Sequence, residues 1–148
     1  MPEFWASQEG KRNIQKLLEQ SKNNDCVILD SNDQNSMPDT LAYARERGMD
    51  TEHVRHRISE TFGVILKQII EEGLQAVILV TGGDTLLGFM KQIRQWELHP
   101  LRELRPGCVL TSLSYKGREY HIITKSGGFG EDTLLLELTE ELKNGEAR

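Results

Sequence analysis

Two glycine-rich turns contain the residue types in this sequence that are best suited to binding an anion. The first, TGGDT (81–85), follows the apolar run 76–80 and precedes a helical pattern that begins near Leu86. The second, KSGGFG (125–130), follows a strand-like segment and precedes the last helical pattern. Glycine lets a ligand approach the backbone closely, and the free N–H groups and dipole of a helix N-terminus favour a phosphate. Together the two turns indicate a nucleotide site.

The first turn does not fit the two best-known phosphate-binding motifs. Gly83 and Gly88 have the glycine spacing of a P-loop, but Phe89 and Met90 stand where that motif requires Lys and Ser or Thr. The GxGxxG dinucleotide fingerprint is also absent from the sequence. From its own pattern, the turn is equally an ordinary strand-to-helix connection in which residue 84 or 85 serves as the helix N-cap. That alternative stays open.

The second turn favours the nucleotide interpretation because it places a positive charge beside glycine amides. Lys125 and Ser126 end the strand-like segment, and Gly127 and Gly128 supply backbone N–H groups. A lysine beside a nest of N–H groups suits a polyphosphate better than it suits a plain turn. We therefore expect phosphates to lie over the two glycines.

The carboxylates near the two turns are expected to act indirectly. Glu131 and Asp132 are expected in the first turn of the last helix, where they would repel a phosphate placed directly on that helix. Asp84 is the other carboxylate at the predicted site. Such groups would contact the ligand through Mg²⁺ and its water shell.

No arrangement of side chains in the sequence identifies a catalytic group, and no residue is assigned as a metal ligand. His53 and His56 are three residues apart on a predicted helix, but a solvated helix face explains them better than a metal pair does. No Ser–His–Asp or Cys–His arrangement can be argued. We interpret Trp5 and Trp96 as packing residues rather than platforms for a base.

Length and charge limit the class of protein. The 148 residues suit one domain (1–148), with residues 1–8 interpreted as a linker or a strand left over from a longer chain. A net charge of -5 and a pI near 5.4 argue against nucleic-acid and membrane-surface binding. No apolar segment approaches the roughly 20 residues that span a bilayer. We predict a cytoplasmic protein in which Cys26 and Cys108 are buried free thiols.

Hydrophobic periodicity predicts the elements that position the two turns. The predicted helices cover 7–22, 51–72, 86–96 and 131–142, with a shorter one around 41–44, and the predicted strands cover 26–29, 76–80, 109–113 and 119–124. The first two strands are apolar throughout, which is typical of parallel pairing beneath helices. The turn 115–118 adds an antiparallel hairpin. The predicted fold class is therefore α/β, with a layered mixed sheet (a parallel core plus an antiparallel hairpin) covered by helices.

Three motifs, in this order, resemble a known family. VILVTGGDT (77–85), ELRPG (103–107) and ITKSGGFG (123–130) look like the C-terminal nucleotide-binding domain of the four-carbon acid sugar kinases, which include threonate, erythronate and 3-oxo-tetronate kinases. Members carry a GGET- or GGDT-like turn, an E-[IL]-x-PG segment and a K-[SA]-G-x-FG loop. The similarity covers nearly the whole chain. Each motif alone is weak, but the ordered set is specific.

The resemblance implies ATP-dependent phosphorylation of a hydroxyl group on a small sugar acid, with ATP and Mg²⁺ as cofactors. It implies that the GGDT turn contacts ATP from one side and the KSGGFG loop contacts it from the other. The residues carried over are Gly82, Gly83, Asp84, Thr85, Lys125, Ser126, Gly127 and Gly128.

The sequence departs from these kinases in one important respect. It has neither the acidic DDxTG-type motif of their sugar-acid-binding half nor the SGS-like segment that begins the nucleotide domain. The resemblance therefore implies the ATP half alone, inactive until a sugar-acid-binding domain joins it in cis or in trans. The alternative is a non-catalytic α/β module that acts through protein contacts. Exposed Phe4 and Trp5 would then form the interface, in a homo-oligomer for example.

Overall fold

The structure is a computed structural model that describes residues 2–31 and 36–145. The helices in these residues are α1 (Pro2–Trp5), α2 (Gln8–Asn23), α3 (Ser36–Glu46), α4 (Thr51–Glu71), α5 (Gly83–Ile93) and α6 (Leu134–Lys143). The strands are β1 (Ile78–Thr81), β2 (His99–Arg105), β3 (Cys108–Tyr115) and β4 (Arg118–Lys125). None of the helices in this part of the chain is long and apolar enough to cross a membrane.

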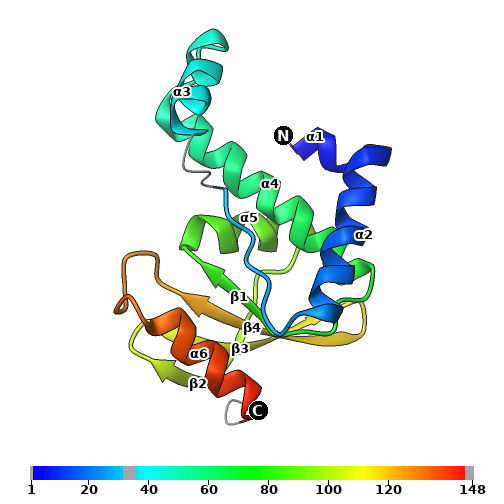
Figure 1. Cartoon of the computed structure of the whole chain (residues 1–148), viewed down its shortest axis with the longest axis vertical. Helices are drawn as coiled ribbons and strands as arrows, with labels where there is room; N and C mark the ends of the chain where they lie inside the picture. The colour runs from blue at the N-terminus through cyan, green and yellow to red at the C-terminus, as the bar shows by residue number, and fades with distance from the viewer. Residues whose placement is uncertain (1, 32–35, 146–148) are drawn as a thin grey trace.

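One sheet lies between two layers of helices (Figure 1). Its strand order is β1-β4-β3-β2, in which β1 and β4 are parallel and the other neighbours are antiparallel. Side chains alternate between the faces, so Ile122 belongs to the core under α4 and α5, whereas Ile123 belongs to the core under α6. Both are fully buried. The predicted mixed α/β sheet is confirmed.

Helices α4 and α5 pack backbone against backbone through two glycines. A Cβ added to Gly88 would lie 2.3 Å from the Ser59 carbonyl oxygen, and one added to Gly63 would lie 2.4 Å from the Gly88 carbonyl oxygen. Any side chain at either position would force the helices apart. The contact therefore holds the middle of α4 against the middle of α5.

The β3–β4 hairpin is the element that the sequence predicts best. Lys116 and Gly117 form its two-residue turn with φ angles of 50° and 75°, the pair of positive angles that a type I′ turn needs. At this end of the hairpin the Lys116 ammonium and the Tyr115 hydroxyl donate to the Glu71 carboxylate, at 2.6 and 2.8 Å. These bonds fix the hairpin to the C-terminal end of α4.

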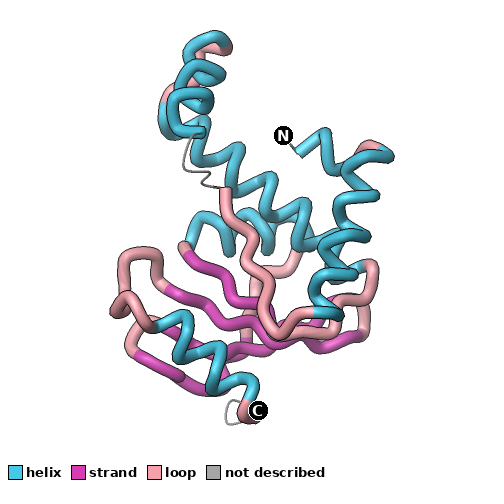
Figure 2. The backbone as a smooth tube through the Cα atoms, viewed as in Figure 1, coloured by secondary structure: helices cyan, strands magenta, loops and turns pink. Residues whose placement is uncertain are grey.

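The segment 26–29 is not a strand, so that prediction is wrong. Figure 2 draws it as a loop, and its apolar side chains are exposed, up to 78% for Ile28. Four apolar residues in a row fit a strand only if another strand pairs with them, and β1 forms its parallel pair with β4 instead. Cys26 is accordingly exposed, whereas Cys108 is buried as predicted.

The N-terminal residues and Trp96 also differ from expectation. Residues 2–5 form α1 rather than a strand, and Trp5 packs partly buried against the core between α2 and α4. Its carbonyl oxygen accepts a hydrogen bond from Gln68, 3.0 Å away, so Trp5 is not the exposed contact that the protein-contact alternative assumes. Trp96 lies beyond the end of α5 and is 66% exposed, although we interpret it as a packing residue.

Strand β2 is absent from the sequence prediction. It is an edge strand with five exposed residues in a row, so it lacks the apolar run that marks β1, β3 and β4. Its pairing with β3 also shifts register twice. Pairing with a strong neighbour, rather than its own periodicity, makes this segment a strand.

Replacing Gly88 with alanine should weaken the α4–α5 contact. We expect Gly88→Ala to lose about 1–3 kcal/mol of unfolding free energy through overpacking, although alanine favours helices by about 1 kcal/mol over glycine. Urea unfolding of parent and variant measures this loss. Gly128→Ala is the matched control, because its added Cβ meets no atom within 4 Å. A Gly88→Ala variant as stable as the parent would contradict the packing described.

The hairpin contact predicts a pH dependence. Donation by Lys116, and then by Tyr115, holds the pKa of the Glu71 carboxyl below its usual value. A lowered pKa in the folded state stabilises the fold above the unfolded value of about 4.3, and this contribution is lost as pH falls through the lower, folded value.

We therefore expect Glu71→Gln to cost about 0.5–1 kcal/mol at pH 7 and clearly less at pH 3, in chemical unfolding at both pH values. Glu19→Gln, at an exposed position of α2, is the control. An equal cost of Glu71→Gln at both pH values would contradict the contact.

Candidate functional site

The parallel pair of β1 and β4 brings the two glycine turns together. Thr81 and Lys125 are paired at the carboxyl ends of these strands. The Gly82 N–H donates to the Lys125 carbonyl oxygen at 2.9 Å, and a Cβ added to Gly127 would lie 3.9 Å from the Gly82 Cα. The two turns that we predict to share a site are therefore adjacent, although they are more than forty residues apart in the sequence.

The ELRPG segment (103–107) supports the KSGGFG turn through a backbone hydrogen bond. Gly107, at the β2–β3 turn, accepts a hydrogen bond of 2.9 Å from the Ser126 N–H through its carbonyl oxygen. A Cβ added there would lie 3.3 Å from the Phe129 side chain, and its φ of 75° favours glycine. The segment 103–107 therefore supports the KSGGFG loop from outside the cavity described next.

A cavity of about 400 Å³ opens between the two turns and α4. Its lining residues are Arg55, Ile58, Ser59, Gly82, Gly83, Asp84, Thr85 and Gly127. Both turns and α4 thus contribute to one space. Among the predicted site residues, all four from the first turn are present, but only Gly127 comes from the second.

The other three predicted residues lie outside this lining. The Lys125 ammonium turns onto its own loop, where it donates to the carbonyl oxygens of Ser126 and Gly127 at 3.0 and 3.2 Å. Ser126 uses its backbone N–H to reach the 103–107 segment. Gly128 is exposed, with no atom within 4 Å of an added Cβ. Two of these residues therefore shape the loop, and the third leaves its backbone open.

The start of α5 leaves backbone donors without side-chain caps. Gly82 is the N-cap, with φ 92°, so the prediction that Asp84 or Thr85 caps this helix is wrong. The first N–H groups of a helix have no acceptor within the helix. A Cβ added to Gly83 would meet nothing within 4 Å. The N–H groups at the start of α5 therefore border open space, as an anion site requires.

The last helix begins later than the sequence suggests. α6 starts at Leu134 with Thr133 as its N-cap, so Glu131 and Asp132 precede the helix instead of occupying its first turn. The expected repulsion between these carboxylates and a phosphate on that helix therefore does not arise in the form predicted. The KSGGFG loop therefore follows directly from the end of β4 and does not lead directly into the first turn of a helix.

Helix α4 contributes to the site although none of its residues is predicted there from the sequence. The Arg55 Nη2 donates to the Asp84 Oδ2 at 3.3 Å, which links α4 to the first turn of α5. Ser59, one turn further along α4, donates its hydroxyl to the Arg55 carbonyl oxygen at 3.1 Å. The hydrophobic stripe of α4 identifies its buried face, but not which helix lies beside its polar edge. Only the pairing of Gly63 with Gly88 reveals that neighbour.

A second cavity, of about 230 Å³, lies between α4 and α5 and shares Arg55, Ser59 and Asp84 with the first. His56 lines it, whereas His53 Nδ1 lies 2.8 Å from Asp50 Oδ1 at the α4 N-terminus. In residues 2–31 and 36–145, no three His, Cys, Asp or Glu side chains gather closely enough to hold a metal ion.

Comparison with protein families shows which family the chain belongs to. The model of the nucleotide-binding C-terminal domain matches residues 4–135, which include both glycine turns and α4. The chain belongs to this family. The resemblance stated from the three motifs is thereby confirmed. No curated protein matches the chain.

Solved structures share the fold. A domain of unknown function (DUF1537) from Bordetella bronchiseptica, a domain-swapped dimer with bound citrate, is 22% identical over 65% of this chain and 24% of its own, with a TM-score of 0.51. A second crystal form of the same protein is 21% identical over 76% of this chain and 32% of its own, with a TM-score of 0.50. A protein described as a putative tRNA synthase from Salmonella typhimurium LT2 is 18% identical over 71% of this chain and 24% of its own, with a TM-score of 0.55. The chain thus spans about a quarter to a third of these solved chains.

Proposed function

We propose that this nucleotide-binding domain is the ATP-binding half of a kinase that phosphorylates a hydroxyl group of a four-carbon sugar acid. The observation that carries the proposal is the meeting of the two glycine turns across the β1–β4 pair, with open space over their backbones. Backbone amides at the start of a helix, opposite a glycine loop, suit a polyphosphate. Membership of the nucleotide-binding family supports the same ligand class.

The proposed roles differ between the two turns. Backbone N–H groups of Gly83, Asp84 and Thr85 would donate to phosphate oxygens, and Gly82 supplies the left-handed conformation that aims them. Gly127 and Gly128 would close the site from the other side. Their loop is held in shape by the Lys125 ammonium on its carbonyls and by the Ser126–Gly107 bond.

Mg²⁺ suits this site as an ion that arrives with the nucleotide. Asp84 is the carboxylate in the cavity lining, and Mg²⁺ commonly uses one or two carboxylates together with phosphates and water. The ion would neutralise phosphate charge there. The chain's own residues would hold the polyphosphate.

The second reactant would be bound by another domain, supplied in cis or in trans. Phosphoryl transfer depends on positioning the acceptor hydroxyl against the phosphate, which one cavity for ATP does not do. The domain-swapped dimer of the Bordetella protein gives a precedent for exchange of domains between subunits. By itself the chain is expected to bind ATP without appreciable phosphorylation.

Gly83→Val tests the site because its side chain would fill the open space over the backbone N–H groups, where an added Cβ meets no other atom within 4 Å. Calorimetric titration with ATP and Mg²⁺ should show binding to the parent and at least tenfold weaker binding to the variant, as expected when a side chain displaces charge-assisted hydrogen bonds. Ala42→Val on the exposed side of α3 is the control, and thermal melting checks folding. Equal heats for parent and Gly83→Val, or none for either, would refute binding at this turn.

One observation favours the alternative of a protein-contact module. Val27, Ile28 and Leu29 expose 40, 78 and 38% of their surface, next to one another in the loop after α2. Contiguous exposed apolar side chains often mark an interaction surface. These residues form a larger exposed apolar segment than Phe4 and Trp5, because Phe4 is exposed but Trp5 is partly buried against α2 and α4.

Sedimentation of the parent and an Ile28→Asp variant separates the two functions. A dimer that Ile28→Asp converts to a monomer, in a protein without ATP affinity, would favour the contact module. A monomer that binds ATP would favour the nucleotide half. Leu136→Asp, at an exposed apolar position of α6, is the matched control for the added charge.

A further inference from the structure

We infer that Arg55 binds the phosphates of the nucleotide, and that it exchanges its contact with Asp84 for one with phosphate when the ligand arrives. The inference rests on the proposed function and names a residue that neither the motifs nor the family comparison assigns.

The described lining of that cavity contains one cation and one anion. Arg55 supplies the positive charge and Asp84 the negative charge, and the other lining residues are uncharged. Lys125, which the motif suggests as the charge partner, instead directs its ammonium to two carbonyl oxygens of its own loop. Without Arg55, a polyphosphate would meet a carboxylate with no positive side chain in the lining to balance it.

The contact between Arg55 and Asp84 is suited to exchange. Its N–O distance is 3.3 Å, and the two side chains are 69% and 68% exposed. Ion pairs as exposed as this one contribute little to stability, so separating them costs little. A guanidinium can donate two parallel hydrogen bonds to a phosphate, which makes a phosphate the stronger partner.

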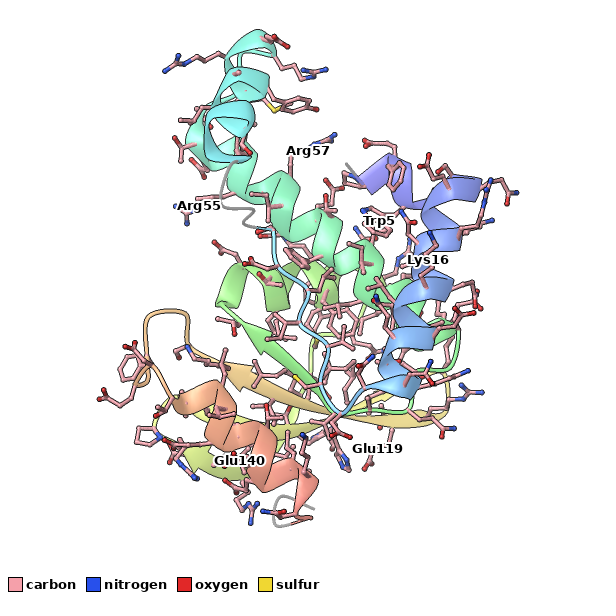
Figure 3. The ribbon with its side chains drawn as sticks, viewed as in Figure 1. Trp5, Lys16, Arg55, Arg57, Glu119 and Glu140 are labelled. Atoms are coloured by element: carbon pink, nitrogen blue, oxygen red, sulfur yellow. The ribbon has the colours of Figure 1, made fainter. Side chains whose placement is uncertain are left out.

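The fold holds Arg55 at the mouth of the cavity. The glycine contact between α4 and α5 fixes the helix axis, and Ser59 lies one turn below Arg55 in the same lining. Figure 3 shows Arg55 on the side of α4 that faces away from α1, whereas Arg57 points toward α1. Arg57 contacts Glu3 at 3.3 Å there. The two arginines of one helix thus have separate environments.

The test compares Arg55→Gln with Arg57→Gln, the same charge change on the same helix outside the cavity. Calorimetric titration of each with ATP, AMP and adenosine in Mg²⁺ reports phosphate dependence. We expect Arg55→Gln to weaken ATP binding about tenfold or more and to weaken adenosine binding less than twofold, with AMP between them. Arg57→Gln should bind all three like the parent. Arg55→Lys should recover part of the ATP affinity, because it restores charge without the planar fork.

Asp84→Asn adds a second measurement in buffer without Mg²⁺. It removes the competing carboxylate, so ATP should bind severalfold more tightly than to the parent, and the gain should vanish in the Arg55→Gln background.

The outcomes separate this inference from the proposed function. If the parent binds ATP and Gly83→Val does not, but Arg55→Gln binds like the parent, the role of Arg55 is refuted and the nucleotide site stands. An equal loss for ATP and adenosine would also refute it, because it would show a structural effect. If the parent binds no ATP, both the proposed nucleotide site and the role of Arg55 are refuted.

Discussion

The parallel pairing of β1 with β4 is the interaction on which the rest of the site depends. Parallel strands end at the same edge of a sheet, so whatever follows each strand meets there. In this protein residues 82–85 follow β1 and residues 126–130 follow β4, and the hydrogen bond from the Gly82 N–H to the Lys125 carbonyl oxygen joins the two turns where the strands end. A shift of β4 by one residue would also exchange Ile122 and Ile123 between the two cores, so burial enforces the register of the site.

A second constraint comes from the helix layer. The glycine contact between α4 and α5 removes the side chains that would normally separate two helices, and it brings a polar edge of α4 over the start of α5. The cavity, and the positions of Arg55 and Ser59 in its lining, depend on that close approach of the helices. The phosphate-binding turn and the helix contact are therefore parts of one construction, because α5 both begins at the turn and carries Gly88.

Local patterns predict most of the fold and only part of the site. The hairpin follows from its turn residues, α4 from its apolar stripe and the Asp50 cap, and the two glycine turns from their position after strands. The two errors in the strands are cases in which a pairing partner decides. Segment 26–29 has strand composition without a strand to pair with, and β2 is a strand despite its polar sequence. Arg55 enters the site because of a contact between residues 63 and 88, which no local pattern encodes.

The chemistry of the cavity fits a division of labour between domains. Its described lining offers backbone amides, two hydroxyl side chains and one guanidinium–carboxylate pair, which can hold and neutralise a polyphosphate. Phosphoryl transfer asks little covalent chemistry of the protein, but it requires the acceptor hydroxyl to be aligned with the phosphate. Under the proposed function, this domain meets the first demand and leaves the second to its partner. Affinity for ATP would then persist in the separate chain while turnover depends on assembly, because binding and alignment reside in different domains.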